Sequence, residues 1–408
     1  MSVCVISKKI GGFCIQRRFN SVLAGDYQLR TTNTLKKPKF DLNYYEKKYD
    51  LFKDICKRRE VPFTMSDEYV ESLKRLEDLK QKILFSKQEL NKYRKTMKKL
   101  IVEQKKAVTN CQSEIDLLKS KIKNMKEPTI QMQEDATNLE DKLTTEVARL
   151  PNLIHSSVQS KQKLVKYLNP TKDIIDSGLE DFPLKSNSKF DHKNIMEKLS
   201  LVDFKEATRV SGRGWYYLKG DAALLEEALV QYALKCARKF GFKMIIPPSI
   251  VKTEITNACG FRPRDQNNEK QVYEIEADEN SERSLCLTGT AEIPLAGLMS
   301  SHTFNDTELP MKYVGVSRSY REEAGAAGRD TRGLYRVHEF TKVELFAWTK
   351  NEESMSMKMF DELANFQMHF IESLGLTARV LIMPFNDLGA PAYKKIDIEA
   401  LMPGRGAW

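Results

Sequence analysis

The sequence predicts an α+β protein, with a largely antiparallel sheet and flanking helices that follow a long antiparallel hairpin of coiled-coil helices. Three observations support this. Apolar residues recur at 3–4 spacing between residues 66 and 150, which is typical of a coiled-coil seam. Beyond residue 190, short strand-like runs mix with helical runs without a βαβ rhythm. The chain contains no G-x-G-x-x-G and no G-x-x-x-x-G-K-[ST], which argues against Rossmann and P-loop folds.

Composition narrows the class of protein. A chain of 408 residues predicts two or more domains, and a net charge of +10 is compatible with a nucleic-acid partner. The seven cysteines form no C-x-x-C pair, which favours a reducing compartment over a zinc ribbon or a disulfide framework. The five histidines form no H-E-x-x-H, so we predict no metal site from the motifs present. No apolar run approaches the roughly 18 residues of a membrane span.

Residues 1–25 differ from the rest of the chain. They carry four basic residues and contain serines, and no acidic residue precedes Asp26. Such a segment predicts a mitochondrial transit peptide, and an ordinary basic N-terminus is the alternative.

The predicted N-terminal helical domain covers residues 26–150, with a short helix over 42–59 and the coiled coil over about 66–150. The pattern is lost over 105–111, where we expect a polar turn between two helices, each on the order of 55 Å long at 1.5 Å per residue. The predicted seam consists of Leu76, Leu79, Ile83, Ser86, Leu90, Tyr93, Met97 and Leu100, then Ile115, Leu118, Ile122, Met125, Thr129, Met132, Ala136, Leu139, Leu143, Glu146 and Leu150.

Pro128 lies inside the second predicted helix. Proline removes a helix hydrogen bond and normally kinks or stops the helix. Because the seam stays in phase across it, we favour one kinked helix, and a turn at 126–130 with an asymmetric hairpin is the alternative.

The arm is basic toward its predicted tip. Residues 66–126 hold 16 Lys/Arg against 9 Asp/Glu, and many of these charges lie off the seam. They are either a solvated helix face or a track for a phosphate backbone. The candidate nucleic-acid-binding residues are Lys95, Lys98, Lys99, Lys105 and Lys106.

Residues 151–190 are weakly patterned and are predicted to be a linker or surface segment, and a compact domain is predicted over 191–408. One helix over 221–240 is expected to pack through an apolar face that includes Leu225 and Leu229. The other expected elements are a helix over 353–374 and strands over 244–246, 271–276, 284–288, 311–320, 337–348 and 379–383.

The loop over 321–336 holds four arginines and three glycines between two of these strands. Glycine lets backbone approach a ligand closely, and the arginine fork suits phosphate or carboxylate. A solvated hairpin tip is the alternative to a binding loop.

The ordered series of motifs resembles the seryl-tRNA synthetases, which are class II aminoacyl-tRNA synthetases. The coiled coil that ends in Leu-Pro-Asn at 150–152 resembles their tRNA-binding arm. Residues 241–248 are similar to class II motif 1, a dimer element, and Thr-Gly-Thr-Ala-Glu at 288–292 is similar to the serine-binding loop. Residues 321–344 resemble motif 2, and 387–403 continue the pattern. With the basic leader, the resemblance is strongest to mitochondrial members.

The resemblance implies ATP-dependent activation of L-serine and its transfer to tRNA-Ser by a homodimer in the mitochondrial matrix, with no membrane partner. Arg321 would be catalytic, gripping the α-phosphate and the serine carboxylate. The implied serine-binding residues are Thr290, Ala291, Glu292, Arg321 and Glu344. The implied ATP-binding residues are Arg321, Glu322, Glu323, Val337 and Phe340.

Each assignment has a structural alternative. Phe340 could be simple core, and Thr290 could be a helix N-cap with Glu292 in the first turn. Glu344 could serve only as an ion-pair partner of Arg336 or Lys342. Against these, a carboxylate in an apolar strand beside an arginine-rich loop is itself typical of a functional site.

The family pattern continues beyond Trp408 into a strand with ATP and Mg²⁺ ligands and then into motif 3. The sequence therefore looks C-terminally truncated, and we expect the Mg²⁺ ligands beyond residue 408. Two alternatives follow: a non-catalytic synthetase-like protein that keeps tRNA or dimer contacts, and a structural coiled-coil protein with a globular cap.

Overall fold

The computed structural model describes residues 5–6, 39–105, 112–178, 184–261, 271–276, 284–323 and 333–408. The chain forms two units, which are described separately below: Lys37–Leu153, and Met1–Lys36 together with Ile154–Trp408. The predicted transit peptide, apart from residues 5–6, and the predicted turn at 106–111 lie outside the described residues. No helix within the described ranges is long and apolar enough to cross a membrane.

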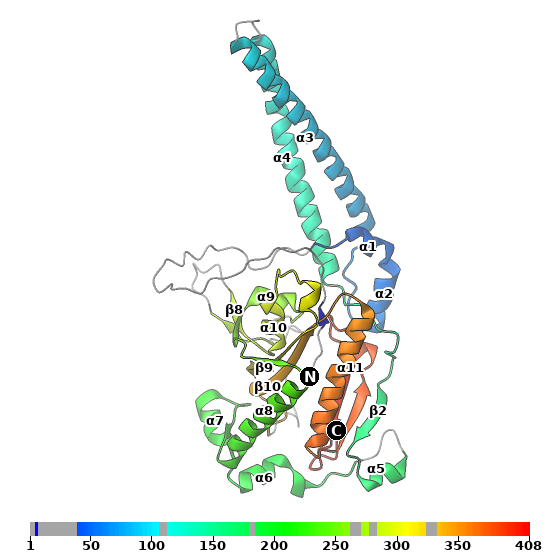
Figure 1. Ribbon diagram of the computed structural model, residues 1–408, viewed down its shortest axis with the longest axis vertical. Helices are drawn as coiled ribbons and strands as arrows, with labels where there is room; N and C mark the ends of the chain where they lie inside the picture. Colours follow the sequence, from blue (N-terminus) through cyan, green and yellow to red (C-terminus); the bar gives the residue numbers. More distant parts are fainter. Residues whose placement is uncertain are drawn as a thin grey trace. The chain divides into compact units, whose positions relative to one another are not determined.

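The first unit is a helical hairpin preceded by two short helices (Figure 1). Helices α3 (Tyr69–Lys105) and α4 (Gln112–Ala148) have 37 residues each, which makes each about 55 Å long. Before them lie α1 (Leu42–Lys47) and α2 (Tyr49–Arg58), where the sequence predicted a single helix. The two long helices confirm the predicted arm.

The seam between the long helices is apolar, as the 3–4 spacing predicted. Its core also takes in residues that precede α3, and the Tyr69 hydroxyl donates to the carbonyl of Leu42 at 3.1 Å. Predicted seam residues that are buried are Leu76, Ile83, Leu90, Ile115, Thr129, Ala136 and Leu143. Removing these side chains from water stabilises a hairpin that has no sheet to pack against.

Pro128 lies within a single continuous α4. The next residue, Thr129, donates its hydroxyl to the carbonyl of Met125 at 2.6 Å, one turn earlier. The prediction of one helix through the proline is therefore confirmed, and the alternative turn at 126–130 is wrong.

The second unit is built on two long strands that pair antiparallel along their whole length, β9 (Met311–Tyr320) and β10 (Glu339–Trp348). Two shorter strands pair parallel at the edges: β5 (Lys243–Ile245) with β9, and β1 (Val5–Ile6) with β10. The sheet order is β1-β10-β9-β5. The central pair is antiparallel as predicted, and the sheet as a whole is mixed.

One face of this sheet packs on two helices, α8 (Asp221–Lys239) and α11 (Glu353–Ser373). Leu345 and Ala347 of β10 point toward them, together with Val314 of β9. Alternate residues of a strand point to opposite faces, so the even-numbered residues of β10 face away from α8 and α11.

The other face packs on the short helix α10 (Glu292–Leu298). Phe346 and Trp348 of β10 form a buried cluster here with Leu295 of α10. This apolar cluster fixes α10 against the sheet, and the even-numbered residues nearer the start of β10 continue the same face.

A second sheet places β11 (Ala378–Ile382) between β12 (Ile396–Ala400) and β2 (Lys163–Leu168), with both pairings antiparallel. Strand β2 lies inside the segment that the weak pattern suggested as a linker or surface segment. The linker description is wrong for these six residues, because their backbone bonds complete the sheet. The surface description holds for all but Leu168, which is buried.

A third sheet has the order β6-β8-β7. Its strands are β6 (Ile250–Lys252), β7 (Glu274–Ile275) and β8 (Leu285–Leu287). Two further short strands are β3 (Val202–Asp203) and β4 (Tyr217–Leu218). The remaining α-helices of the described residues are α5 (Lys172–Ser177), α6 (His192–Lys198), α7 (Phe204–Ser211) and α9 (Thr253–Ala258).

The buried face of α8 differs from the prediction. Ala233, Leu234 and Ala237 are buried, whereas Leu225 and Leu229, which were expected to face the core, are 59% and 39% exposed. The apolar residues of α8 cover more of its circumference than one sheet can bury, so the helix leaves part of its apolar surface uncovered within this chain.

Candidate active site

The floor of the site is the face of the sheet that also carries Phe346. Here β10 presents Phe340, Lys342 and Glu344, which occupy every second position of the strand and therefore share one face. The register places Ser319, Ser317 and Gly315 of β9 directly opposite them. All three are small, and Leu295 of α10 packs against Gly315, where an added Cβ would lie 3.3 Å from Leu295 Cδ1.

Glu344, Lys342 and Thr290 form a buried polar cluster at this face. Glu344 and Thr290 are each 1% exposed. The Lys342 ammonium lies 2.6 Å from Glu344 Oε2 and donates to Thr290 Oγ1 at 2.7 Å, while Thr290 Oγ1 donates to the same carboxylate oxygen at 2.9 Å. A buried charge is tolerated when it is paired and hydrogen-bonded. Glu344 and Lys342 pair with each other, and the Thr290 hydroxyl bonds to both.

The segment before α10 delivers Thr290 to this cluster. The Tyr320 amide, at the end of β9, donates to the carbonyl of Thr288 at 2.9 Å, and the Thr288 hydroxyl donates to the carbonyl of Thr290. These bonds lock the 288–292 loop onto the sheet. The N-cap of α10 is Ala291, without a side-chain cap bond, so the alternative that Thr290 is the N-cap is wrong. The Glu292 amide makes only a long contact with Thr290 Oγ1, at 3.4 Å.

Ala291 and Glu292 complete the predicted serine loop. Ala291 is buried completely and Glu292 is 6% exposed. Burial and the nearby Glu292 carboxylate together raise the pKa of the Cys259 thiol to about 12. A second buried carboxylate thus lies at the start of α10, on the same segment that positions Thr290.

Arg321 and Phe340 lie against each other at the outer end of the strand pair. The guanidinium carbon of Arg321 is 5.1 Å from the centre of the Phe340 ring, a cation–π geometry. The Arg321 amide donates to the carbonyl of His338 at 2.9 Å, which fixes its backbone. Arg321 is exposed and Phe340 is only partly buried, so Phe340 is not the simple core residue of the structural alternative.

The remaining predicted nucleotide residues surround the base of the loop. Arg336 pairs with Glu323 across the loop at 3.4 Å, and Glu323 has φ 48°, a left-handed conformation that is uncommon for glutamate. The Glu322 amide donates to the carbonyl of Gln271 at 3.3 Å. Val337 is 8% exposed. Arg329 and Arg332 fall in 324–332, outside the described residues.

Arg318, near the loop's base, faces away from this site. Its guanidinium pairs with Glu226 of α8 and with Glu339, each at 3.0 Å, and donates to Thr341 at 2.7 Å. Arg318 and Thr341 are register partners on the face opposite to Lys342. The alternation of the strand separates Arg318 from Arg321, although they are only three residues apart.

Sequence reasoning underrated two residues. Lys342 was considered only as an ion-pair partner of Glu344, yet it also donates to Thr290. His338 was not singled out: its Nδ1 lies 2.9 Å from the Tyr273 hydroxyl, and its ring stacks on Trp215 at 5.7 Å. The period-2 pattern of 338–344 could have identified Lys342, whereas His338 depends on partners distant in sequence.

On the helical arm, Lys95, Lys98 and Lys99 of α3 are exposed. Lys105 is the last residue of α3, and Lys106 lies outside the described residues. Lys95, Lys98 and Lys99 are thus accessible to a partner's charge, as are solvated lysines in general.

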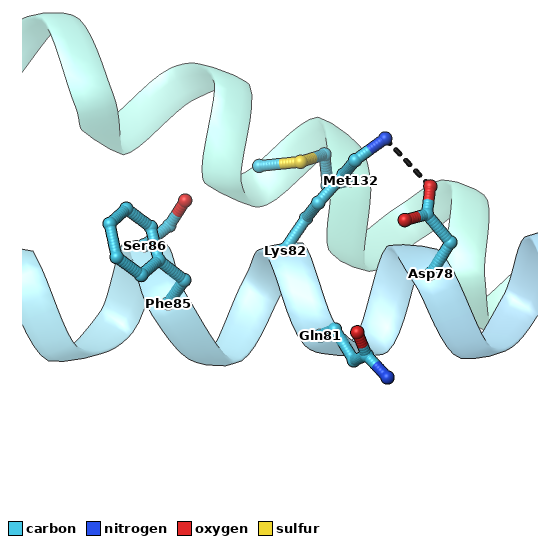
Figure 2. A pocket seen from close by; sticks show the side chains of 6 residues that line it. All are labelled: Asp78, Gln81, Lys82, Phe85, Ser86 and Met132. Atoms are coloured by element: carbon cyan, nitrogen blue, oxygen red, sulfur yellow. Dashed lines mark ion pairs between the residues drawn. The ribbon is translucent and has the colours of Figure 1, made fainter.

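Lower on the arm, a groove of about 490 Å³ lies between α3 and α4 (Figure 2). Phe85, which is 65% exposed, and Met132 form its apolar part. Lys82 and Asp78 pair beside them at 2.6 Å. Among the residues that line this groove, Phe85 is the apolar side chain that does not belong to the seam between α3 and α4.

The described residues include no group of three His, Cys, Asp or Glu side chains that could hold a metal ion.

Two family models match the chain. Residues 40–154 match the seryl-tRNA synthetase N-terminal domain, and residues 273–408 match the tRNA synthetase class II core domain for G, H, P, S and T. The first covers the helical unit, and the second covers the two long strands and the face with Glu344.

Individual relatives agree with these matches. The chain is 40% identical to the mitochondrial serine–tRNA ligase of Saccharomyces cerevisiae over 382 residues, which is 91% of this chain and 79% of that protein. It is 48% identical to the mitochondrial enzyme of Schizosaccharomyces pombe over 228 residues, which is 55% of this chain and 46% of that one.

The fold is similar to that of the seryl-tRNA synthetase from Pyrococcus horikoshii, whose crystal structure is complexed with ATP. The TM-score is 0.68 at 28% identity, and the match covers 90% of this chain and 82% of that chain.

Proposed function

The chain belongs to the seryl-tRNA synthetases (serine–tRNA ligases), a family of class II aminoacyl-tRNA synthetases, and from this premise we propose that it activates L-serine with ATP and transfers the seryl group to tRNA-Ser. The observation that carries the proposal is the buried cluster of Glu344, Thr290 and Lys342 beside the exposed arginine of the loop. The cluster offers fixed acceptors for a small polar amino acid, and Arg321 offers a fork for phosphate.

Serine recognition is assigned to Thr290, Ala291, Glu292, Arg321 and Glu344. The serine hydroxyl would donate to the Glu344 carboxylate, while Thr290 and Glu292 would receive the ammonium group. Lys342 and Thr290 already bond Oε2 of Glu344, so the serine hydroxyl would add a further bond to a buried carboxylate. A ligand without a hydroxyl would lack that bond, at a cost of about 1–3 kcal/mol. Lys342 pairs with Glu344 at 2.6 Å and would hold the carboxylate in position for this task.

ATP recognition is assigned to Arg321, Glu322, Glu323, Val337 and Phe340. Arg321 would be the catalytic residue, since its fork can neutralise charge that develops at the α-phosphate while a carboxylate oxygen of serine attacks it and pyrophosphate leaves. Phe340 would stack on the adenine. Arg321 lies over one face of the Phe340 ring. The adenine would therefore stack on the opposite face of the ring, or the guanidinium would move aside when ATP binds.

Mg²⁺ is proposed as the usual companion of ATP, where it would neutralise phosphate charge. None of the described side chains is assigned to it, and the roles given above do not depend on it.

The tRNA surface is proposed to be the outer part of the arm, with Lys95, Lys98, Lys99, Lys105 and Lys106 on the phosphate backbone. Such contacts add affinity through counterion release and carry no base specificity.

A homodimer is proposed through the uncovered apolar surface of the second unit. It consists of Leu224, Leu225 and Leu229 of α8 with Met244, Ile246 and Ile250. Exposed apolar side chains that gather on neighbouring elements are typical of interaction sites.

A mitochondrial location is proposed, with the matrix as the compartment, and the support is that the two relatives described above bear the designation mitochondrial. The domain limits are likewise proposed: a transit peptide over 1–25, the helical arm over 26–150, and a class II catalytic domain over 191–408.

Serine-dependent exchange of pyrophosphate into ATP is the direct test. We expect exchange with serine and none above background with alanine or glycine. No serine-dependent exchange would favour the non-catalytic alternative, and retention of tRNA-Ser binding in that case would identify it.

A further inference from the structure

The descending limb of the site loop, residues 333–338, is tied to helix α6. The Leu334 amide donates to Nε2 of His192 at 2.9 Å. His192 is the first residue of α6 and lies 142 positions away in sequence. Because Nε2 accepts this bond, it carries no hydrogen, and the proton of the neutral ring is on Nδ1.

The surroundings hold the imidazole in one place. The Tyr335 ring meets it edge-on at 4.3 Å, and the Arg405 guanidinium covers Tyr335 at 4.5 Å. Gly333 has φ 73°, and a Cβ there would overlap the His192 ring. Glycine is thus required at 333 both for its backbone conformation and for the approach of the imidazole.

The same limb is tied to the rest of the loop at two further points. Arg336 pairs with Glu323 at 3.4 Å, and the His338 carbonyl accepts from the Arg321 amide at 2.9 Å. Both bonds join the two limbs of one hairpin, so they would move with it. The bond from Leu334 to His192 joins the limb to a separate helix.

We propose that His192 is a positioning residue, which anchors the descending limb through the Leu334 amide and thereby sets the place of Val337 and Phe340 in the nucleotide site. The anchor requires an acceptor at Nε2, whatever the chemistry at the site. Only its effect on nucleotide binding rests on the proposed function.

The tie is sensitive to protonation, because an imidazolium donates at both nitrogens and cannot accept from an amide. The groups that face the ring are Asp191 on its own element, Tyr335 on the loop, and Arg405 on the C-terminal segment. Burial lowers the pKa of His192, Asp191 opposes that shift, and Arg405 adds to it. Nδ1 is buried and makes no hydrogen bond within the described part of the chain, so no acceptor there favours the charged form.

The test compares amide hydrogen exchange of residues 333–340 in the full chain, for the wild type, His192→Ala and His192→Gln. The glutamine carbonyl can replace Nε2 as acceptor, whereas alanine cannot. Lys193→Ala is the control, since it removes only a partly exposed neighbour and its 3.5 Å pair with Glu197. Circular dichroism and thermal unfolding verify that each variant is folded.

We expect the Leu334 amide to exchange about tenfold faster in His192→Ala and at close to the wild-type rate in His192→Gln and Lys193→Ala. We also expect His192→Ala to raise the KM for ATP severalfold more than it lowers kcat, with rescue by glutamine. Equal exchange in wild type and His192→Ala overturns the anchor. If His192→Ala and His192→Gln accelerate exchange of the Leu334 amide equally, the anchor is also overturned, because the effect would then come from lost packing and not from a lost hydrogen-bond acceptor. Absence of pyrophosphate exchange in the wild type would contradict the proposed function and leave the hydrogen-exchange result valid.

Discussion

Thr290 Oγ1 donates to Glu344 Oε2 at 2.9 Å across 54 positions of sequence, and both side chains are 1% exposed. The bond joins the loop before α10 to the middle of β10. The orientation of the Glu344 carboxylate therefore depends on the loop that carries Thr290, and a substitution at either residue should alter the position of the other side chain.

Glu344→Gln should raise the KM for serine by about 10²-fold, because the amide is a weaker acceptor and Lys342 loses its counter-charge. Removing one partner of a buried ion pair also costs about 3–5 kcal/mol of stability. Exchange kinetics with varied serine and chemical denaturation measure the two effects. The matched variant combines Glu344→Gln with Lys342→Met. It should recover stability but not serine affinity, and recovery of both would contradict the assigned role.

Arg321→Ala should reduce serine-dependent pyrophosphate exchange by at least about 10³-fold, because the developing phosphate charge loses its donor fork. Binding of tRNA-Ser should be unchanged, since the lysines of the arm are untouched. Arg318→Ala is the matched control: it removes an arginine near the end of β9, three residues before Arg321, whose side chain lies on the other face and pairs with Glu226 and Glu339. The assignment fails if both variants lose equal activity, or if Arg321→Ala keeps full exchange.

Reversal of charge at Lys98, Lys99, Lys105 and Lys106 should weaken tRNA-Ser binding and flatten its salt dependence, by roughly one unit of slope for each phosphate that the arm no longer neutralises. Titrations between low and moderate salt measure this. The control reverses two basic residues at the base of the arm, Lys74 and Arg75, and should leave the slope unchanged. An identical slope in both variants would count against the phosphate track.

Ile246→Asp should convert the proposed dimer into a monomer, because a carboxylate would have to be buried in the proposed interface. Ile246 is 78% exposed in the single chain, so the monomer itself should fold normally. Sedimentation velocity measures the mass. Val210→Asp, on a side chain that is 64% exposed outside that surface, should leave it unchanged, and a dimeric Ile246→Asp protein would disprove the interface.

Stability should fall as the pH drops below about 6.5, the ordinary histidine pKa, partly because of His192. Its pKa is lowered in the folded state, so the unfolded chain takes up the proton first, and stability that is complete above pH 6.5 is lost as pH falls through the folded pKa. Thermal unfolding at pH 5.0 to 8.0 measures the trend. His192→Gln should show a weaker dependence over this range, and an unchanged dependence would show that other groups cause it.

The sequence predicted most strongly those features that depend on local periodicity. The arm, the continuity of α4 through Pro128 and the pair β9–β10 each follow from spacing within one segment. The role of Glu344 was implied by the family resemblance, and its position as a carboxylate in an apolar strand supported that assignment.

The features that were missed depend on distant partners. Strand β2 has a weak pattern of its own, and it becomes a strand because β11 offers an unpaired edge. Leu225 and Leu229 of α8 were expected in the core, although the sheet has room for only part of that helix's apolar circumference. His192 gave no signal in the sequence, since the amide that it binds lies 142 residues away.

The alternation along β10 has a consequence for folding accuracy. Leu345 faces α8 and α11, while Glu344 faces α10 and the site. A slip of β10 by one residue against β9 would drive the carboxylate into an apolar core and place leucine beside the Lys342 position. The carboxylate proposed to recognise serine therefore also destabilises pairing of β9 and β10 in a shifted register. A mutation at 344 that alters amino-acid preference by removing this charge would reduce that penalty, and the two strands would be less strongly held to the native register.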